Sequence, residues 1–134
     1  MGNSTRSMGK WPLPEGIAPT VDITFEAFQE LVRQVMDGVP APFDELLRKV
    51  PVIVLPDSPE HEPTLLGRYH GVPLPDRSHG EPILPSTIEI YWRPLCHDAR
   101  SDAQLREQVR ITVLHELGHH LGMDEDDLDR LGYG

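Results

Sequence analysis

The feature that most constrains the fold of this chain is a segment of about twenty residues between Ser101 and Gly122. Ser101 is followed three residues later by Gln104, which is the pattern of a capping box at the start of a helix. Gly122 can adopt the left-handed conformation that commonly ends one. An apolar stripe recurs every four residues between these ends: Val109, Val113, Leu117 and Leu121. The segment therefore predicts a long helix with one face packed in the core.

The same segment places two histidines, His115 and His119, four residues apart, with Glu116 next to the first. Four residues turn a helix by about 400°, so the two imidazoles lie about 40° apart on one face and can share one ion. A catalytic zinc ion uses three protein ligands and leaves a fourth position to water. Glu116 lies about 100° from His115, a direction suited to a general base rather than to a ligand.

The third ligand must come from beyond the helix, where residues 124–127 are four consecutive acids. Because Gly122 can break the helix, the chain can turn back and bring one of these side chains to the metal. Glu125 is our first choice, since it follows His115 by ten residues, the spacing at which zincins with a glycine turn supply their third ligand. Asp126 and Asp124 are the alternatives.

The rest of the chain predicts helices first and strands after them. Residues 1–20 are polar and proline-rich and are expected to form a flexible arm, leaving 21–134 as the domain. Apolar residues at spacings of three and four predict a helix from Thr24 to Gly38, and a shorter one over 43–50 that Pro51 ends.

Three short strands are predicted between the helices. Residues 52–55 are uniformly apolar and predict a strand covered on both faces, whereas 65–72 predict a weaker strand with possible bulges at its glycines. Residues 73–85 are typical of a loop, and 87–92 alternate as a half-buried strand does. With a last short helix at 125–131, we expect an α+β fold in which a sheet of about three strands packs against the long metal-binding helix and the N-terminal helices.

Composition excludes several classes of partner. The chain has 12 basic and 22 acidic residues, a formal charge of −10 that disfavours nucleic acid. It has no apolar run long enough to span a membrane and no apolar stretch in its first ten residues for a signal peptide. Cys96 is the single cysteine, so an intramolecular disulfide is impossible and a cytoplasmic location is expected. The sequence specifies no oligomeric state.

The string HELGHHLGMDE at 115–125 resembles the active-site segment of the bacterial minimal zincins, a family of small metallopeptidase-like proteins. Weaker likenesses are FEAF at 25–28, LGRYHGVPL at 66–74, IEIY at 88–91 and LGY at 131–133, so the resemblance covers about residues 22–133. It implies a compact α+β domain with a zinc-dependent peptidase-like site. The family usually has aspartate where Glu125 stands, so either the longer carboxylate reaches the metal or Asp126 replaces it.

Other candidate residues have simpler interpretations. His120 lies about 40° from Glu116 around the helix and is interpreted as a core or supporting histidine rather than a substrate contact. Tyr133 can either point its hydroxyl at an oxyanion or pack by its ring. Cys96 is interpreted as a core residue. The histidines outside the motif are interpreted as ordinary surface residues: His61, His70, His79 and His97.

These patterns predict a zinc-dependent metalloprotease, a hydrolase whose partner is a peptide or protein substrate. Zn²⁺ would be held by His115, His119 and Glu125, with Glu116 as general base. A substrate strand is expected to pair beside residues 87–92, if these form a sheet edge. The alternative is a catalytically silent zinc module that binds a protein partner. Esterase or amidase action on a small substrate uses the same chemistry and stays open.

Overall fold

The structure is a computed structural model, and it describes residues 20–71 and 86–132. Most of the predicted N-terminal arm, the loop predicted at 73–85, His79 and Tyr133 lie outside the described residues. The described part has helices and strands in this order: α1 Phe25–Asp37, α2 Phe43–Lys49, β1 Val52–Leu55, β2 Gly67–His70, β3 Thr87–Tyr91, α3 Trp92–Asp98, α4 Asp102–His120 and α5 Glu125–Leu131. The predicted α+β class, with a small three-stranded sheet, is confirmed.

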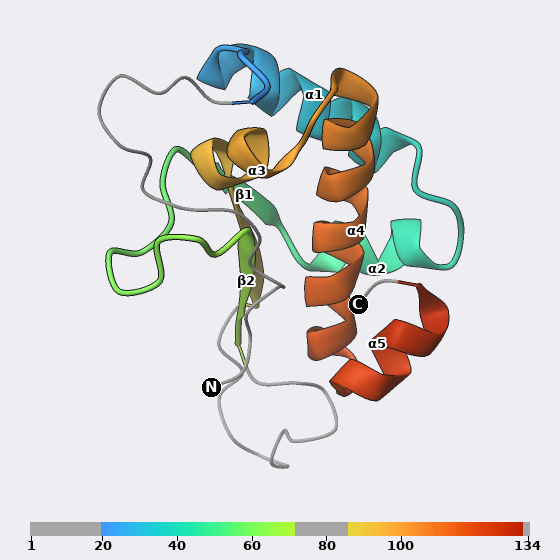
Figure 1. Cartoon of the computed structure of the whole chain (residues 1–134). Coiled ribbons are helices and arrows are strands. Elements are labelled where there is room, and N and C mark those ends of the chain that lie inside the picture. The colour runs from blue at the N-terminus through green and yellow to red at the C-terminus, as the bar shows by residue number, and fades with distance from the viewer. Residues whose placement is uncertain (1–19, 72–85, 133–134) are drawn as a thin grey trace.

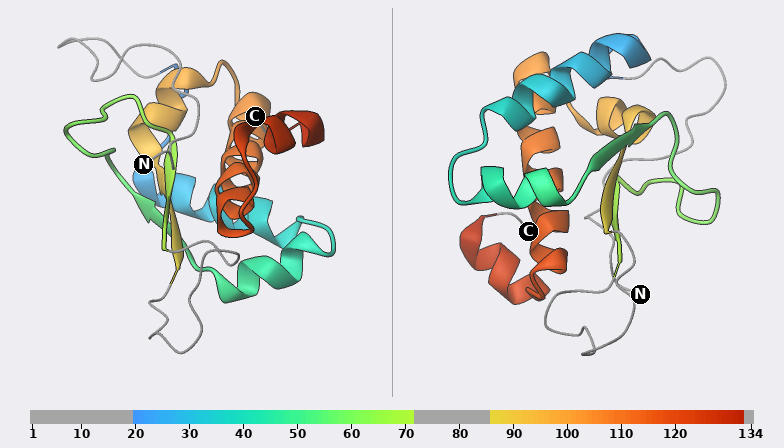
Figure 2. Two further views of the ribbon diagram at one scale, coloured as in Figure 1. Left: turned by 90° about the horizontal axis from the view of Figure 1, so that it is seen from below. Right: turned by 180° about the vertical axis from the view of Figure 1, so that it is seen from behind.

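Helix α4 is the central element, and it contacts β2 and β3 as well as α1, α2 and α3. Figure 1 shows it running alongside the sheet, while α5 lies against its C-terminal half on the side away from the sheet, as Figure 2 also shows. Ser101 caps α4 by accepting a hydrogen bond from the Gln104 amide at 3.1 Å. The Gln104 side chain, however, accepts from the amide of Arg100 instead of closing the predicted box on Ser101.

Helix α4 ends in a tight turn at Gly122, where the chain reverses its direction. Gly122 has a φ of 82°, the left-handed value predicted for it. Its amide donates to the His119 carbonyl at 3.0 Å, and the amide of Met123 donates to the Gly118 carbonyl at 2.9 Å. This pair of bonds is the Schellman motif, which satisfies the last carbonyls of the helix. The chain turns back at once, and α5 begins three residues after Gly122.

The sheet has the strand order β1-β3-β2, with β1 parallel and β2 antiparallel to β3. Two predictions are therefore wrong. Residues 87–91 form the central strand, whose two edges are already paired, so no substrate strand can pair beside them. β1 is an edge strand whose Ile53 is 38% exposed, so it is not covered on both faces.

Close packing joins the inner face of the sheet to α4. Gly67 pairs regularly with Ile90 and forms no bulge. A Cβ atom at Gly67 would lie 2.6 Å from Cγ2 of Thr112 on α4 and 2.9 Å from the Glu89 carbonyl oxygen. Because real Cβ atoms do not approach other atoms so closely, glycine at this position lets β2 lie directly against α4.

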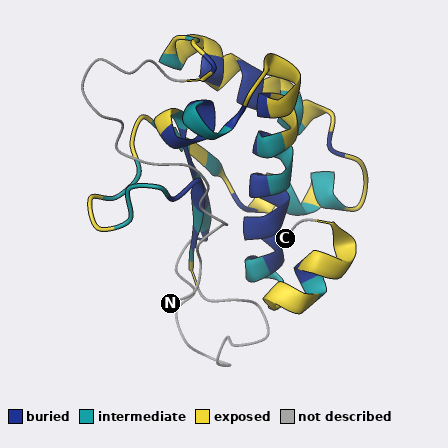
Figure 3. Ribbon diagram, viewed as in Figure 1, coloured by how far each residue is buried: buried dark blue, intermediate teal, exposed yellow. Residues whose placement is uncertain are grey.

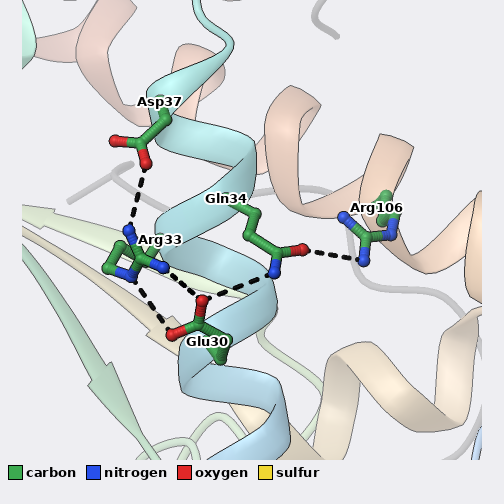
Figure 4. Close-up of polar contacts among 5 residues, drawn as sticks. All are labelled: Glu30, Arg33, Gln34, Asp37 and Arg106. Atoms are coloured by element: carbon green, nitrogen blue, oxygen red, sulfur yellow. Dashed lines mark hydrogen bonds and ion pairs between the residues drawn. The ribbon is translucent and has the colours of Figure 1, made fainter.

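Helix α1 covers the N-terminal half of α4, and polar contacts link the two on the surface. Figure 4 shows Gln34 of α1 accepting a hydrogen bond from Arg106 of α4, with an oxygen-to-nitrogen distance of 3.0 Å. The neighbouring Arg33 contacts Glu30 and Asp37 within α1. These pairs are exposed and therefore contribute little to stability. As predicted, α1 begins at Thr24, which caps it by accepting a hydrogen bond from the amide three residues later.

Burial is concentrated along α4 and the inner face of the sheet, whereas α5 is exposed except at Leu128 and its half-buried neighbour (Figure 3). The predicted stripe on α4 is buried at Val109, Val113 and Leu117 and half-buried at Leu121. Within the described ranges, no helix is both long and apolar enough to cross a membrane.

Candidate metal centre

The candidate site lies at the C-terminal end of α4, where His115 and His119 stand one helical turn apart. Their ring centroids are 4.9 Å apart, and the rings meet edge to face. The His115 side chain is 2% exposed and that of His119 is 11% exposed. The two imidazoles thus lie in nearly dry surroundings, and their position on one face of the helix is the one that the four-residue spacing predicts.

Glu125, the first residue of α5, reaches both rings. Its Oε2 atom lies 3.5 Å from Nε2 of His115 and 3.5 Å from Nε2 of His119. These separations are longer than a normal N–H to O hydrogen bond. Zinc bound tetrahedrally at about 2.0–2.1 Å from each donor would place neighbouring donors about 3.4 Å apart. The two distances therefore fit a zinc ion between the three side chains better than they fit direct hydrogen bonds.

The neighbouring acids are used differently. Asp124 is the N-cap of α5, and its Oδ1 accepts from the Asp127 amide at 2.8 Å. The Asp127 carboxylate accepts from the Asp124 amide at 3.2 Å, which completes a capping box. Asp126 is exposed in the first turn of α5. Among the acids at 124–127, Glu125 is the one whose carboxylate contacts the two imidazoles.

Burial also favours the form of histidine that binds metals. It lowers the pKa of His119, and the neighbouring His115 lowers it further, whereas Glu125 opposes the shift. A lowered pKa keeps the imidazole neutral near pH 7, and neutral imidazole is the form that coordinates zinc. The Nε2 atom of His119 has no hydrogen-bond partner among the described residues, which leaves its lone pair available.

Glu116 lies beside this trio and is fully buried. The ligand atoms of His115, Glu116 and His119 all lie within 4.8 Å of one another, so two carboxylates border the site. Glu125 lies at equal distances from the two rings, as a shared ligand position requires. Glu116 points about 100° away from His115 around α4, which leaves it beside the site and suited to accept a proton.

His120 turns away from the two imidazoles toward the sheet. Its Nδ1 atom lies 2.8 Å from the hydroxyl of Tyr69 on β2, which also donates to Oγ of Ser86 at 3.0 Å. His120 is 7% exposed and Tyr69 is fully buried. This burial agrees with the interpretation of His120 as a supporting residue. Sequence reasoning did not identify Tyr69, because nothing in a short strand signals a partner 51 residues away.

The other candidates are not brought to the site. Cys96 is buried in the core, and this burial raises the pKa of its thiol to about 12, as an inert core cysteine requires. His61 is exposed, whereas His97 is half-buried. His70 is also half-buried, with its Nε2 atom 3.0 Å from Oε1 of Glu89, so it is not the plain surface residue that was predicted.

The chain is similar to known proteins in both sequence and fold. A family model described as zincin-like metallopeptidase matches residues 47–134, which include His115, His119, Glu116 and the acids at 124–127. The fold is similar to that of a conserved hypothetical protein from T. thermophilus, with a TM-score of 0.54 and 30% sequence identity. That match covers 74% of this chain and 94% of the other.

Proposed function

This chain belongs to the zincin-like metallopeptidase family, and from the geometry of its site we propose that it is a zinc-dependent peptidase. The observation that carries the proposal is the pair of 3.5 Å distances from one Glu125 oxygen to the two imidazoles. These two distances are close to the edge length of a zinc tetrahedron, whose fourth corner would be left to water or substrate. His115, His119 and Glu125 are the proposed ligands.

Each residue has a distinct part in the proposed reaction. When bound, zinc supplies Lewis acidity, which polarises a carbonyl group and lowers the pKa of water toward about 7. Glu116 accepts a proton from the attacking water and returns it to the leaving amine. Glu116 is fully buried beside the proposed ligands, which places its carboxylate within reach of a water in the site. The substrate is a peptide or protein.

The test compares metal content and cleavage of an unstructured protein, casein, in the native chain and two variants. We expect one zinc ion per native chain. Glu116→Gln should keep zinc and lose cleavage, since the amide cannot accept the proton. Glu125→Ala should lose zinc affinity, because one of three ligands is removed. Glu107→Gln is the matched control, since that residue lies on α4 but is half exposed and paired with Arg110.

Each outcome selects one interpretation. Unchanged cleavage by Glu116→Gln would refute the assigned base, and unchanged zinc affinity in Glu125→Ala would move the third ligand to Asp126 or Asp124. One zinc ion per native chain without any cleavage would favour the silent module that binds a protein partner. Absence of zinc binding would refute both the peptidase and the module.

A further inference from the structure

Helices α4 and α5 approach each other closely at Gly118. A Cβ atom there would lie 2.3 Å from Cδ2 of Leu128 and 3.3 Å from its Cγ, so the leucine occupies the space that any larger residue would need. Leu128 is fully buried, although the rest of α5 is exposed or half-buried. The packing of Leu128 on Gly118 is therefore the main contact that holds α5 on α4.

Both residues of this contact are close in sequence to the proposed ligands. On α4, Gly118 stands between the two imidazoles in sequence, three residues after His115 and one before His119. On α5, Leu128 follows Glu125 by three residues, and residues three apart share a helix face. Leu128 and Glu125 therefore lie on the same side of α5, one in contact with Gly118 and the other near the two imidazoles.

We propose that Gly118 and Leu128 form a seat that positions Glu125 for metal binding, so that Gly118 is a positioning residue of the site. The proposal rests on the zinc site proposed above. Glycine is a poor choice inside a helix compared with alanine, and Gly118 has helical geometry with no turn to require it. Its use at this position is explained by the space that Leu128 needs.

The experiment measures zinc affinity by competition with a chelator, using zinc alone as the probe. Gly118→Ala should weaken binding about 10- to 100-fold, the loss typical when groups that hold a metal ligand are disturbed. Gly38→Ala is the matched control, since a Cβ there would meet nothing closer than 3.6 Å and zinc affinity should be unchanged. The visible spectrum of bound Co²⁺ should change in Gly118→Ala only, because it reports the ligand geometry directly.

A double variant distinguishes the loss of the Gly118–Leu128 contact from a general effect of introducing alanine at position 118. Leu128→Ala removes the atoms that the new Cβ would meet, so adding Gly118→Ala to it should cause no further loss of zinc affinity. If Gly118→Ala does not fold alone, recovery of a cooperative melt in the double variant supports the seat. A double variant that is also unfolded, while Leu128→Ala folds, overturns it.

Two results would overturn the seat while leaving the zinc site standing. One is native zinc affinity in Gly118→Ala, and the other is an equal loss from Gly118→Ala with and without Leu128. A native chain that binds no zinc would instead refute the proposed function, so the two failures are distinguishable.

Discussion

The hydroxyl of Tyr69 joins β2 to the end of α4, and replacing Tyr69 with phenylalanine tests how much that link stabilises the fold. The ring is fully buried, so phenylalanine fills the same space. The change removes two hydrogen bonds, one with His120 at 2.8 Å and one with Ser86 at 3.0 Å. Both partners are buried, so neither regains a bond to bulk water as easily as an exposed group would.

The expected loss follows from these two bonds. A hydrogen bond between uncharged groups contributes about 1 kcal/mol to stability, so the free energy of unfolding should fall by about 2 kcal/mol. The entropy of unfolding is about 2.1 cal/mol/K per residue, which gives about 0.28 kcal/mol/K for this chain of 134 residues. The melting temperature should therefore fall by about 7 °C.

The assay is thermal and urea unfolding in the presence of a chelator, so that zinc affinity does not enter. Tyr91→Phe is the control, because its hydroxyl donates to Glu89, which is 22% exposed and also paired with His70. Its loss should be smaller than that of Tyr69→Phe, because one hydrogen bond is removed rather than two and the partly exposed Glu89 can be hydrated in its place. If Tyr69→Phe changed the free energy of unfolding by less than about 0.5 kcal/mol, the link would not stabilise the fold.

Three further predictions concern other parts of the chain. Cys96, with its pKa raised to about 12 by burial, should resist iodoacetamide at about pH 8 in the native protein and react in urea, as mass spectrometry would show. Gly67→Ala should lower the free energy of unfolding by about 1–3 kcal/mol through overpacking against Thr112, and Thr112→Ser should recover part of the loss in urea titrations. Asp124→Asn should keep native zinc affinity by calorimetry because asparagine also caps helices, whereas a large loss would identify Asp124 as a ligand.

The ends of α4 and the pairing of its two histidines could be predicted from the sequence, because short-range interactions determine them. The start of α4 at Ser101 and its end at Gly122 could be predicted, because a capping side chain and a left-handed glycine act on residues only a few positions away. The pairing of His115 with His119 could be predicted for the same reason, since helix geometry places residues four apart on one face. Helix α3 was not predicted: it has only seven residues, no side chain caps its start, and it carries Pro94 in its first turn, where proline is tolerated.

Features that depend on contacts between distant parts of the chain could not be predicted from the sequence. The position of β3 between β1 and β2 depends on pairings across the chain, and the alternation within 87–91 is the same in a central strand as at an edge. The exposure of Ile53 has the same origin, since an apolar run does not reveal which faces a helix will cover. The contact of Tyr69 with His120 follows only once β2 lies on α4.

The turn at Gly122 has a consequence for how zinc and folding are linked. Because it brings α5 back within a few residues, the three proposed ligands span only eleven positions of the chain, from 115 to 125. Closing so short a loop costs little entropy, so the unfolded chain can also gather these side chains around an ion. Zinc that binds both states raises the melting temperature less than its affinity for the native state implies. The metal can then engage this segment before the distant strands have paired.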